Sequence, residues 1–564
     1  TQTFTSTTTA QASYQDFVAY TGTVRGRLGY ILDNHWLIFG TGGFALAYDK
    51  LRRTGFTEMF ASATGSAGDV QTALLWRLGW TVGAGIEVPV APNWTAKLEY
   101  LYASFDNNRA VFFNPAQRFE SNAAIQSLRL GFNYQIGDAA KWGQFLGNGP
   151  SPILEDRFNL HGQLTYVSQY SPRFRSPYVG PQSLIPNQGR ETAGATFYLG
   201  ARLWNGAELW VNPDLDQGFG LGNTHGIAGF VNGQALKVGS DYPYPRLSRS
   251  FLRQTINLGG EMEKVEAGLN QFAGSRSANR IVITAGKFSV SDIFDENRYA
   301  HDPLNDFLNW GLIDAASFDY AGDAWGYTYG ASVEWYQGAW ALRAGIFDLP
   351  VQPNSTELDP GFQQFQTMFE VERRHEIAGQ PGKVAVTGWL SRARLGNYNN
   401  AVALAQFSGQ PADIAAVRHY TSRSGIAANL EQQVTSNWGI FLRTGLASPN
   451  VEPDSLTDVD RTVAVGASFS GKQWGRPDDA WGVAGILNNI STSHQTFFNN
   501  GGLGIVIGDG QLPHSGTEQI IETYYTVPLY GWKVTFDYQF INNPAYNRDR
   551  GPVSVLGTRL HLQF

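Results

Sequence analysis

The last 48 residues, TEQIIETYYTVPLYGWKVTFDYQFINNPAYNRDRGPVSVLGTRLHLQF (517–564), alternate between apolar and polar side chains. The pattern is clearest in residues 532–540, where an aromatic residue or Val occupies every second position and polar side chains fall between them. Residues 520–525 and 558–564 repeat it. A period of two is that of a β-strand, whose successive side chains point to opposite faces. The stretch therefore predicts three strands joined by turns.

The rest of the chain repeats this pattern, in about twenty segments of roughly ten residues that break at Gly, Asn, Pro or Asp. A soluble sandwich also alternates, but it buries its apolar face. Here the strands carry aromatic residues near their ends and polar or charged residues on one face, as a bacterial outer-membrane barrel requires. Closure of such a barrel satisfies every backbone group without an open edge. The predicted fold class is all-β, a transmembrane antiparallel β-barrel in the bacterial outer membrane.

The composition agrees with this class. Gly supplies 64 of the 564 residues, aromatic residues 13% and charged residues only 16%. No segment reaches the ~18–20 uncharged apolar residues that a membrane-spanning helix needs. A net charge of −7 without a basic run argues against a nucleic-acid partner. The absence of Cys excludes disulfides, thiolate zinc sites and a Cys nucleophile, and it fits an exported protein. No signal peptide begins at Thr1, so we expect either a mature chain or a missing start.

From Phe158 onward the pattern predicts sixteen strands. They cover about 158–170, 192–204, 207–214, 251–260, 279–290, 325–337, 340–349, 366–377, 383–395, 423–436, 438–448, 461–473, 481–491, 517–528, 530–541 and 553–564. Short turns such as Asn205-Gly206 alternate with long connections such as 216–250 and 296–324. This asymmetry is typical of periplasmic turns and extracellular loops, and an even count near sixteen is typical of porins with an aqueous channel.

The chain before this barrel is organised differently. Residues 138–152 (DAAKWGQFLGNGPSP) contain Gly and Pro without alternation, and we expect them to link a first segment, 1–137, to the large barrel, 153–564. Five strands are predicted in the first segment, at 22–32, 36–50, 77–90, 94–105 and 125–136. Its blocks GTVRGRLGY, WTVGAGIE, NWTAKLEYLY and LRLGFNY resemble the small eight-stranded opacity/OmpA-like barrels over residues 20–137.

The resemblance is partial, because the first three strands of that family have no counterpart and Thr1–Gln15 reads as a short polar tail. Either upstream residues are missing or the segment pairs with something else. Alternation places six charged residues on the face opposite the apolar stripe: Arg25, Arg27, Glu87, Lys97, Glu99 and Arg129. The interior of an eight-stranded barrel is only wide enough for side chains, so we expect these charges to fill it and to make a structural anchor. The alternative is that the charges are solvated on a half-sheet.

The large barrel carries a second and longer resemblance. Residues 201–239, 278–337, 501–510 (GGLGIVIGDG) and 522–553 resemble the carbohydrate-selective porin family, and the similarity extends over 153–564. This resemblance implies a non-energised channel that favours glucose and other mono- or oligosaccharides. We therefore expect facilitated diffusion of carbohydrates into the periplasm without any cofactor.

A wall that passes sugars needs aromatic faces for stacking and polar groups that exchange hydrogen bonds with hydroxyls, while binding stays weak. Arginine offers a fixed fork of donors suited to vicinal hydroxyls. The residues that alternation places on the polar face, and that we predict to line the channel, are Arg202, Glu208, Trp210, Asn212, Arg253, Asn257, Arg343, Arg443, Lys533, Asp537 and Arg559. Of these, Arg202, Glu208 and Arg253 are the best single candidates, because they lie on neighbouring strands beside a long loop. The alternatives are that the charges only solvate the wall and that Trp210 packs against the lipid interface or a loop.

Two long connections are candidates for a constriction inside the barrel. The first is 216–250, which contains Phe219, His225, Phe230, Tyr242, Tyr244, Arg246 and Arg249. The second is 296–324, which contains Arg298, His301, Asp302, Asp306, Trp310, Asp314 and Asp319. The clustered carboxylates of DSLTDVD (454–460) lack the spacing of a calcium loop, and we expect no metal site.

Three alternatives to a sugar channel remain open at this point. A general diffusion porin would not discriminate between solutes, and a plugged structural outer-membrane protein would not conduct. An extracellular carbohydrate-active enzyme could also combine many Trp residues with paired carboxylates. We see no catalytic nucleophile and base and expect no enzyme. The expected partners are transported sugars, outer-membrane lipid and lipopolysaccharide, and other copies of the chain if it is a homo-oligomer; trimer and monomer both remain open.

Overall fold

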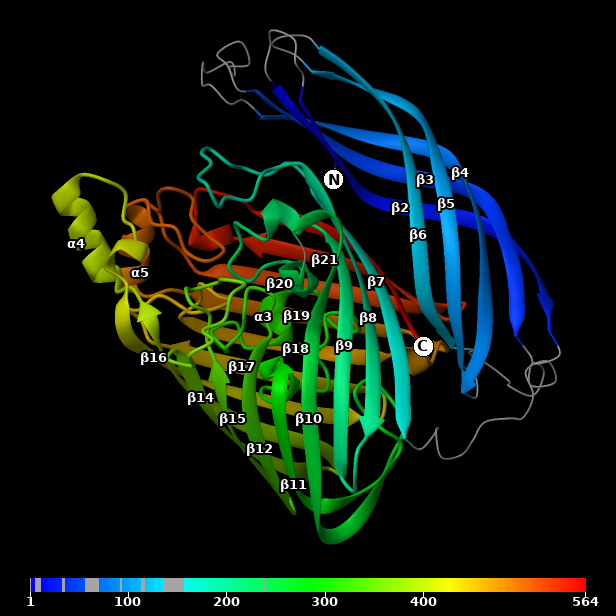
Figure 1. Ribbon diagram of the computed structural model, residues 1–564. Coiled ribbons are helices and arrows are strands. Elements are labelled where there is room, and N and C mark those ends of the chain that lie inside the picture. The colour runs from blue at the N-terminus through cyan, green and yellow to red at the C-terminus, as the bar shows by residue number, and fades with distance from the viewer. Residues whose placement is uncertain are drawn as a thin grey trace. The chain divides into compact units, whose positions relative to one another are not determined.

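The computed structural model of the chain describes residues 2–5, 12–32, 36–55, 70–91, 94–112, 117–134, 157–237 and 239–564. The chain divides into two compact units, Thr1–Arg157 and Phe158–Phe564. Figure 1 colours the first unit blue and the second cyan to red. The expected linker at 138–152 lies outside the described residues.

The first unit is a six-stranded antiparallel sheet with the strands in sequence order. The strands are β1 (Gln2–Thr5), β2 (Ala12–Ile31), β3 (Leu37–Gly55), β4 (Val70–Ala91), β5 (Trp94–Phe112) and β6 (Gln117–Tyr134). The prediction of five strands was therefore wrong, because the polar tail forms β1 and the start of β2. This stretch is rich in Thr, which favours extended backbone but gives no apolar alternation by which a strand could be recognised.

The two faces of this sheet differ as alternation predicts. Val24, Leu28 and Leu128 are exposed, with 78%, 85% and 71% of their surface accessible. On the opposite face Arg25 contacts Glu99 at 2.8 Å, and Arg27 contacts Glu87. Because β2 and β5 are not neighbours in the sheet, the pairing of Arg25 with Glu99 requires the sheet to curl until its charged face meets itself.

The second unit is a closed antiparallel barrel of sixteen strands, as predicted. The strands are β7 (Phe158–Ser171), β8 (Gln188–Arg202), β9 (Ala207–Gly218), β10 (Ser240–Val265), β11 (Gly274–Phe288), β12 (Thr328–Gln337), β13 (Trp340–Asp348), β14 (Phe365–Ile377), β15 (Gln380–Leu395), β16 (His419–Thr435), β17 (Trp438–Ala447), β18 (Arg461–Ser470), β19 (Ala480–Asn489), β20 (Glu518–Leu529), β21 (Trp532–Asn542) and β22 (Val553–Gln563). The barrel closes where β22 pairs with β7, for example Leu560 with Tyr166. Closure leaves no open strand edge in this unit.

Side chains alternate between the outside and the interior of this barrel. On β21 the outward Phe536 has 60% of its surface exposed, whereas the inward Asp537 has 5%. On β12 the outward Tyr329 and Trp335 lie near opposite ends of the strand, where aromatic residues meet the two membrane interfaces. None of the helices in the described part of the chain is long and apolar enough to span a membrane.

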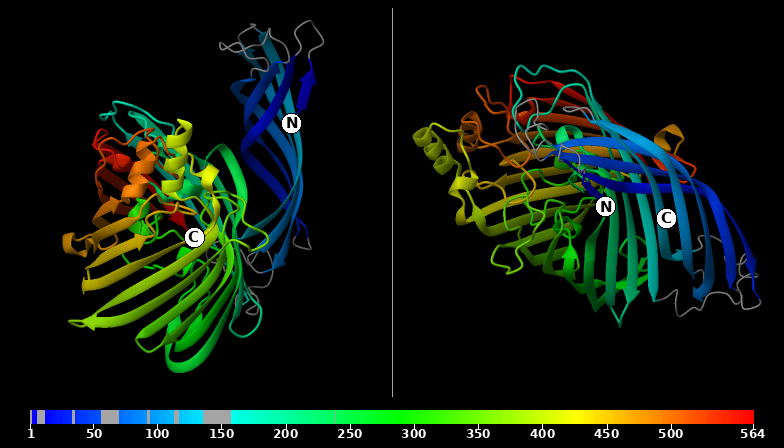
Figure 2. Two further views of the ribbon diagram at one scale, coloured as in Figure 1. Left: turned by 90° about the vertical axis from the view of Figure 1, so that its left-hand side faces the viewer. Right: turned by 45° about the horizontal axis from the view of Figure 1, so that its top comes forward.

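The connections differ at the two ends of the barrel. One end has two-residue turns, such as Gln337 to Trp340 and Leu529 to Trp532, and the other carries the long connections. The helices α3 (Trp310–Ile313), α4 (Tyr398–Ser408) and α5 (Thr492–Asn499) all belong to long connections. Figure 2 shows α4 and α5 together at that end, where Tyr398 stacks on His494 with ring centroids 4.1 Å apart. Short 3-10 turns occur at Leu221–Asn223, Gly233–Lys237, Val290–Asp292, Ala415–Val417, Gly471–Trp474 and Pro544–Tyr546.

The largest departure from the predicted strand bounds is at β10. The strand begins at Ser240, eleven residues earlier than expected, so the connection from β9 runs only from 219 to 239. Pro243 and Pro245 lack the backbone N–H that a sheet ladder uses, and they concealed the strand in the sequence. The pairing of β9 with β10 shifts register between Ser240 and Tyr244, next to the first of these prolines.

Candidate functional site

The connection between β11 and β12, residues 289–327, folds into the barrel and packs there as an apolar core. Phe307, Trp310 and Leu312 in this segment are at most 3% exposed. Trp310 also stacks on Phe230 of the β9–β10 connection, with ring centroids 5.3 Å apart. Both connections predicted as candidates for a constriction therefore contribute to one core inside the barrel.

Inward arginines of the wall hold this segment by its backbone. Arg443 on β17 is fully buried, and its Nη1 donates to the carbonyl oxygens of Ala300 at 2.5 Å and Leu312 at 2.6 Å. The same guanidinium forms an ion pair with Asp295 at 3.1 Å. Arg559 on β22 donates to the carbonyl oxygens of Pro303 and Asp306, at 2.7 and 2.8 Å. These two predicted channel residues thus anchor the segment instead of lining open space.

Inward glutamates of β20 bind the complementary backbone groups. Glu522 accepts hydrogen bonds from the N–H groups of Leu308 and Asn309, at 2.6 and 3.0 Å. Glu518, four residues earlier on the same face, accepts from Ala228 and Gly229 at 3.0 and 2.8 Å. One strand therefore fixes both inward connections through their peptide groups.

Two further predicted residues lie near these anchors. Lys533 donates to the side chain of Asn305 at 2.6 Å. Asp537 is buried beside Gln539, which donates to it at 3.1 Å and also donates to the carbonyl of Val231. Both residues lie on β21. Lys533 contacts the β11–β12 connection directly, whereas Asp537 is linked to the β9–β10 connection through Gln539.

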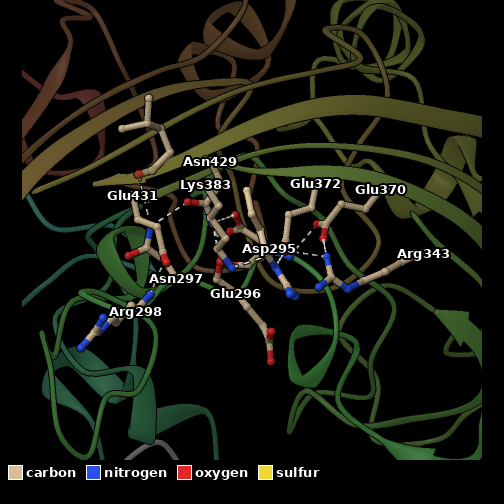
Figure 3. A network of polar contacts seen from close by, with 12 residues as sticks. Asp295, Glu296, Asn297, Arg298, Arg343, Glu370, Glu372, Lys383, Asn429 and Glu431 are labelled. Carbon is tan, nitrogen blue, oxygen red and sulfur yellow. Dashed lines mark hydrogen bonds and ion pairs between the residues drawn. The ribbon is translucent and has the colours of Figure 1, made fainter. Parts of the chain in front are cut away.

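A network of polar side chains on β13 to β16 holds the start of the inward segment (Figure 3). Glu370 accepts from the backbone N–H of Asp295 at 2.9 Å, and Asn429 donates to the Asp295 side chain at 2.7 Å. Glu431 accepts from the N–H of Arg298 at 2.6 Å. Glu296 lies between these anchored residues, and Figure 3 shows its side chain pointing away from the network.

The predicted residue Arg343 belongs to the same network. It contacts Glu370 at 2.6 Å, Glu372 at 2.9 Å and Glu334 at 3.4 Å. Its three carboxylate partners come from the strands on either side of β13. The guanidinium is therefore neutralised within the wall while its edge borders the lumen.

Open space remains between the inward segment and the wall. A cavity of about 680 Å³ is lined by Arg253, Arg280, Arg343, Glu296 and Glu334, among others. A second cavity of about 300 Å³ lies toward the long connections, beside Tyr198, Arg249 and Tyr327. The two cavities share four lining residues, Leu269, Asn270, Asp292 and His301. These four residues therefore border both cavities and mark the junction between them.

Charged groups at this junction and in the adjoining larger cavity have shifted pKa values. Enclosure within the barrel raises the pKa of Glu296 to about 7, although its side chain is open to the cavity. Burial lowers the pKa of His301, and the nearby Arg443 lowers it further, so this imidazole is neutral at pH 7. Burial opposes ionisation of Asp292, but Arg249 at 2.6 Å holds the pKa of that carboxyl below its usual value. The junction therefore contains a fixed ion pair, and the larger cavity beside it contains a carboxyl whose pKa is raised to about 7.

The remaining predicted residues gather around the connection between β10 and β11, residues 266–273. Arg202, Glu208, Arg253 and Asn257 border a cavity of about 310 Å³ there. Trp210 is fully buried and packs against Phe272 with ring centroids 5.0 Å apart, which agrees with the alternative of loop packing. Asn212 is also fully buried, one inward position further along β9.

Sequence reasoning identified the inward face but not every residue that matters on it. It missed Asp292 and Glu518 altogether. Glu518 and Glu522 share a face at a spacing of four, and this signal could have marked β20 as an anchoring strand. Within the described ranges, no group of three His, Cys, Asp or Glu side chains is placed to hold a metal ion.

Comparison with curated proteins relates part of the chain to small outer-membrane proteins. It is 37% identical over 119 residues to a 31 kDa outer-membrane immunogenic protein of Brucella melitensis, a match covering 21% of this chain and 46% of the relative. It is 33% identical over 88 residues to a 22 kDa outer membrane protein of Rhizobium leguminosarum, covering 16% and 34%. The chain thus spans less than half the length of these relatives. The likeness is consistent with the strand-rich first unit.

Comparison with solved structures and family profiles concerns the large barrel. A structure of Pseudomonas putida OprB superimposes with a TM-score of 0.55 at 16% identity, covering 73% of this chain and 95% of that one. It supports the sixteen-stranded fold. The profile of the carbohydrate-selective porin, OprB family matches residues 182–564, more than half of the chain. The chain therefore belongs to the carbohydrate-selective porin, OprB family, and is an outer-membrane β-barrel porin, a channel rather than an enzyme.

Proposed function

We propose that the protein passes mono- and oligosaccharides into the periplasm by facilitated diffusion through the large barrel. The single observation that carries this proposal is the lumen beside the inward segment. Its larger cavity of about 680 Å³ has room for a hydrated sugar and combines Arg, Glu and Tyr side chains on one wall. Paired charges supply donors and acceptors for hydroxyls while leaving little net field to hold an ion.

The predicted wall residues take two roles in this proposal. Arg253 presents its guanidinium to the passing solute, and Arg343, almost fully buried, holds in place the carboxylates of the same wall. Arg202, Glu208 and Asn257 border the side cavity at the short-turn end. The other predicted residues set the shape of the lumen: Arg443, Lys533, Asp537 and Arg559 support the inward connections, Trp210 packs against Phe272, and Asn212 fills the wall on the same face of β9. Residues 1–137 form an anchoring module in lipid and 138–152 link it to the porin. Lipopolysaccharide surrounds the barrel, and no cofactor takes part.

Liposome swelling tests the proposal. Purified protein is reconstituted, and swelling rates are compared for glucose, a disaccharide and a size-matched amino acid. We expect faster swelling with the sugars. Equal rates would make the protein a general diffusion porin, and no swelling would make it a plugged structural barrel; either result overturns the proposal.

A matched pair of variants ties the swelling to the described lumen. Glu296→Trp places an indole where the side chain faces the cavity, and we expect it to slow the swelling with every sugar. Glu357→Trp changes an exposed residue in the connection between β13 and β14 that borders none of the described cavities, and it should leave the rates unchanged.

A further inference from the structure

The connection between β10 and β11, residues 266–273, differs from most other turns at its end of the barrel. The β12–β13, β14–β15 and β20–β21 connections have two residues each. The β10–β11 strands instead reach further than their neighbours at the lower end of the barrel in Figure 1. The eight residues that join these two strands contact inward side chains of β7, β8 and β9, the three strands that precede β10 in the barrel.

Three wall side chains dock this connection through its backbone. Arg253 donates to the carbonyl oxygen of Asn270 at 2.8 Å. Asn159 on β7 donates to the carbonyl of Gln271 at 2.9 Å, and Arg202 on β8 donates to that of Ala273. These hydrogen bonds come from three different strands, so the turn is fixed with respect to the barrel wall.

Apolar packing and internal hydrogen bonds complete the attachment. Phe272 is 7% exposed, lies against Trp210, and is covered by the Arg202 guanidinium 4.7 Å from its ring centroid. Gly268 and Gln271 exchange backbone hydrogen bonds of 2.9 and 3.1 Å, which close the turn on itself. The connection is therefore a rigid part of the lumen.

The tip of this connection stands where the cavities meet. Leu269 and Asn270 line both the 680 Å³ cavity and the 300 Å³ cavity. Gln271 lines the larger cavity and the 310 Å³ side cavity. Opposite the tip, Asp292 and His301 of the inward segment line the same junction.

We propose that the β10–β11 connection is the second side of the constriction, so that solute size is limited between its tip, Leu269–Asn270, and the inward segment at Asp292 and His301. The long connection enters from one end of the barrel and the β10–β11 connection from the other. Arg202 and Arg253 are positioning residues for the turn in this arrangement, and Arg253 also borders the larger cavity directly.

Thiol modification tests this directly, because the chain contains no Cys. In Asn270→Cys the new thiol is the only one, and a bulky methanethiosulfonate reagent attached there should reduce single-channel conductance by about half or more. The matched control is Ala378→Cys in the β14–β15 turn, which is exposed at the same end and borders none of the three cavities. Modification of this control should leave conductance unchanged.

Two results would overturn the inference: complete modification of Asn270→Cys, verified by mass, without a change in conductance, or a thiol at this position that the aqueous reagent fails to reach. A second variant guards against local misfolding. Leu269→Gly with Asn270→Gly removes both tip side chains but keeps the carbonyl that Arg253 binds. It should raise the ratio of trisaccharide to glucose swelling about twofold, since the constriction widens; an unchanged ratio would contradict the inference.

The inference rests on the proposed passage of sugars only for the ratio of trisaccharide to glucose swelling. Conductance is measured with salt alone and reports the turn independently of any sugar. Block of conductance without sugar swelling would therefore refute the proposed function and uphold the inference, whereas sugar swelling without block would do the reverse.

Discussion

The two units of this protein place charges on the inner face of their strands by the same alternation, but the charges bind different partners. In the first unit, side chains pair with side chains: Arg25 with Glu99, and Arg77 with Asp49. In the second unit, Arg343 likewise pairs with neighbouring carboxylates, but other wall charges bind peptide groups of segments that are distant in sequence. Arg443 and Glu518 are examples, each contacting backbone atoms more than 100 residues away.

Width accounts for this difference. In a narrow curled sheet, side chains of β2 and β5 reach one another, and the charges neutralise in place. Across a sixteen-stranded barrel the walls are too far apart for side chains to meet, and such barrels hold water or inserted chain. Alternation thus predicts which residues face inward, and the number of strands determines whether those residues can reach side chains across the interior or only inserted chain and water there.

Loss of Arg443 should have the largest effect. Arg443→Ala leaves Asp295 buried without its cation and frees the carbonyls of Ala300 and Leu312, so we expect the free energy of unfolding to fall by about 3–5 kcal/mol. Channel conductance should rise as the segment moves. Urea unfolding in detergent and planar-bilayer recording measure both. Arg461→Ala, at an exposed position on β18, serves as the control; equal effects of the two variants would break the comparison.

In the first unit the corresponding change is Arg77→Leu, which leaves Asp49 and Asp16 on the inner face without their cationic partner. We expect a loss of about 3 kcal/mol in local stability, because a buried carboxylate loses its partner. Replacing Arg77 and Asp49 together by Leu should cost much less than Arg77→Leu alone. Hydrogen exchange of the β3 and β4 amides in the full chain measures this. Additive losses would show that the two side chains do not act as a pair.

Glu518→Ala should have a smaller effect, since it removes a buried acceptor of the N–H groups of Ala228 and Gly229. Leaving these donors unsatisfied should cost about 1–3 kcal/mol and speed hydrogen exchange in residues 227–231. The control is Gln519→Ala, the adjacent outward residue. Unchanged exchange in 227–231 would mean that the segment holds its place without β20.

The smallest expected effect concerns charge in the lumen. With a pKa of about 7, Glu296 is mostly neutral at pH 6 and ionised at pH 8, so the preference for cations should increase over this interval. Reversal potentials in a salt gradient measure the shift. Glu296→Gln should abolish it, whereas Glu357→Gln, at an exposed position that borders none of the described cavities, should preserve it. A persistent shift in Glu296→Gln would assign the titration to another group.

The sequence allowed the strands and their faces to be predicted, because period-two alternation is local. Phe536 and Asp537 point to opposite sides, as expected. The roles of Arg443 and Arg559 could not be predicted, since their partners are backbone carbonyls 131 and 253 or more residues away, in a segment that is mostly irregular. Because backbone atoms are the same in every residue, the sequence does not show which backbone groups a side chain will bind. The β10–β11 turn was missed because nothing in Leu269–Asn270 indicates that the strands bend inward.

The attachment of the inward segments through peptide groups has an evolutionary consequence. The anchoring side chains bind backbone groups of these segments: Arg443 and Arg559 bind C=O groups, and Glu518 and Glu522 bind N–H groups. Every residue has a backbone C=O, and every residue except proline has a backbone N–H. Side chains on the free side of the segment can therefore be exchanged while the anchors remain. A barrel built in this way can acquire a new solute preference by point substitution in one loop, without redesign of its wall.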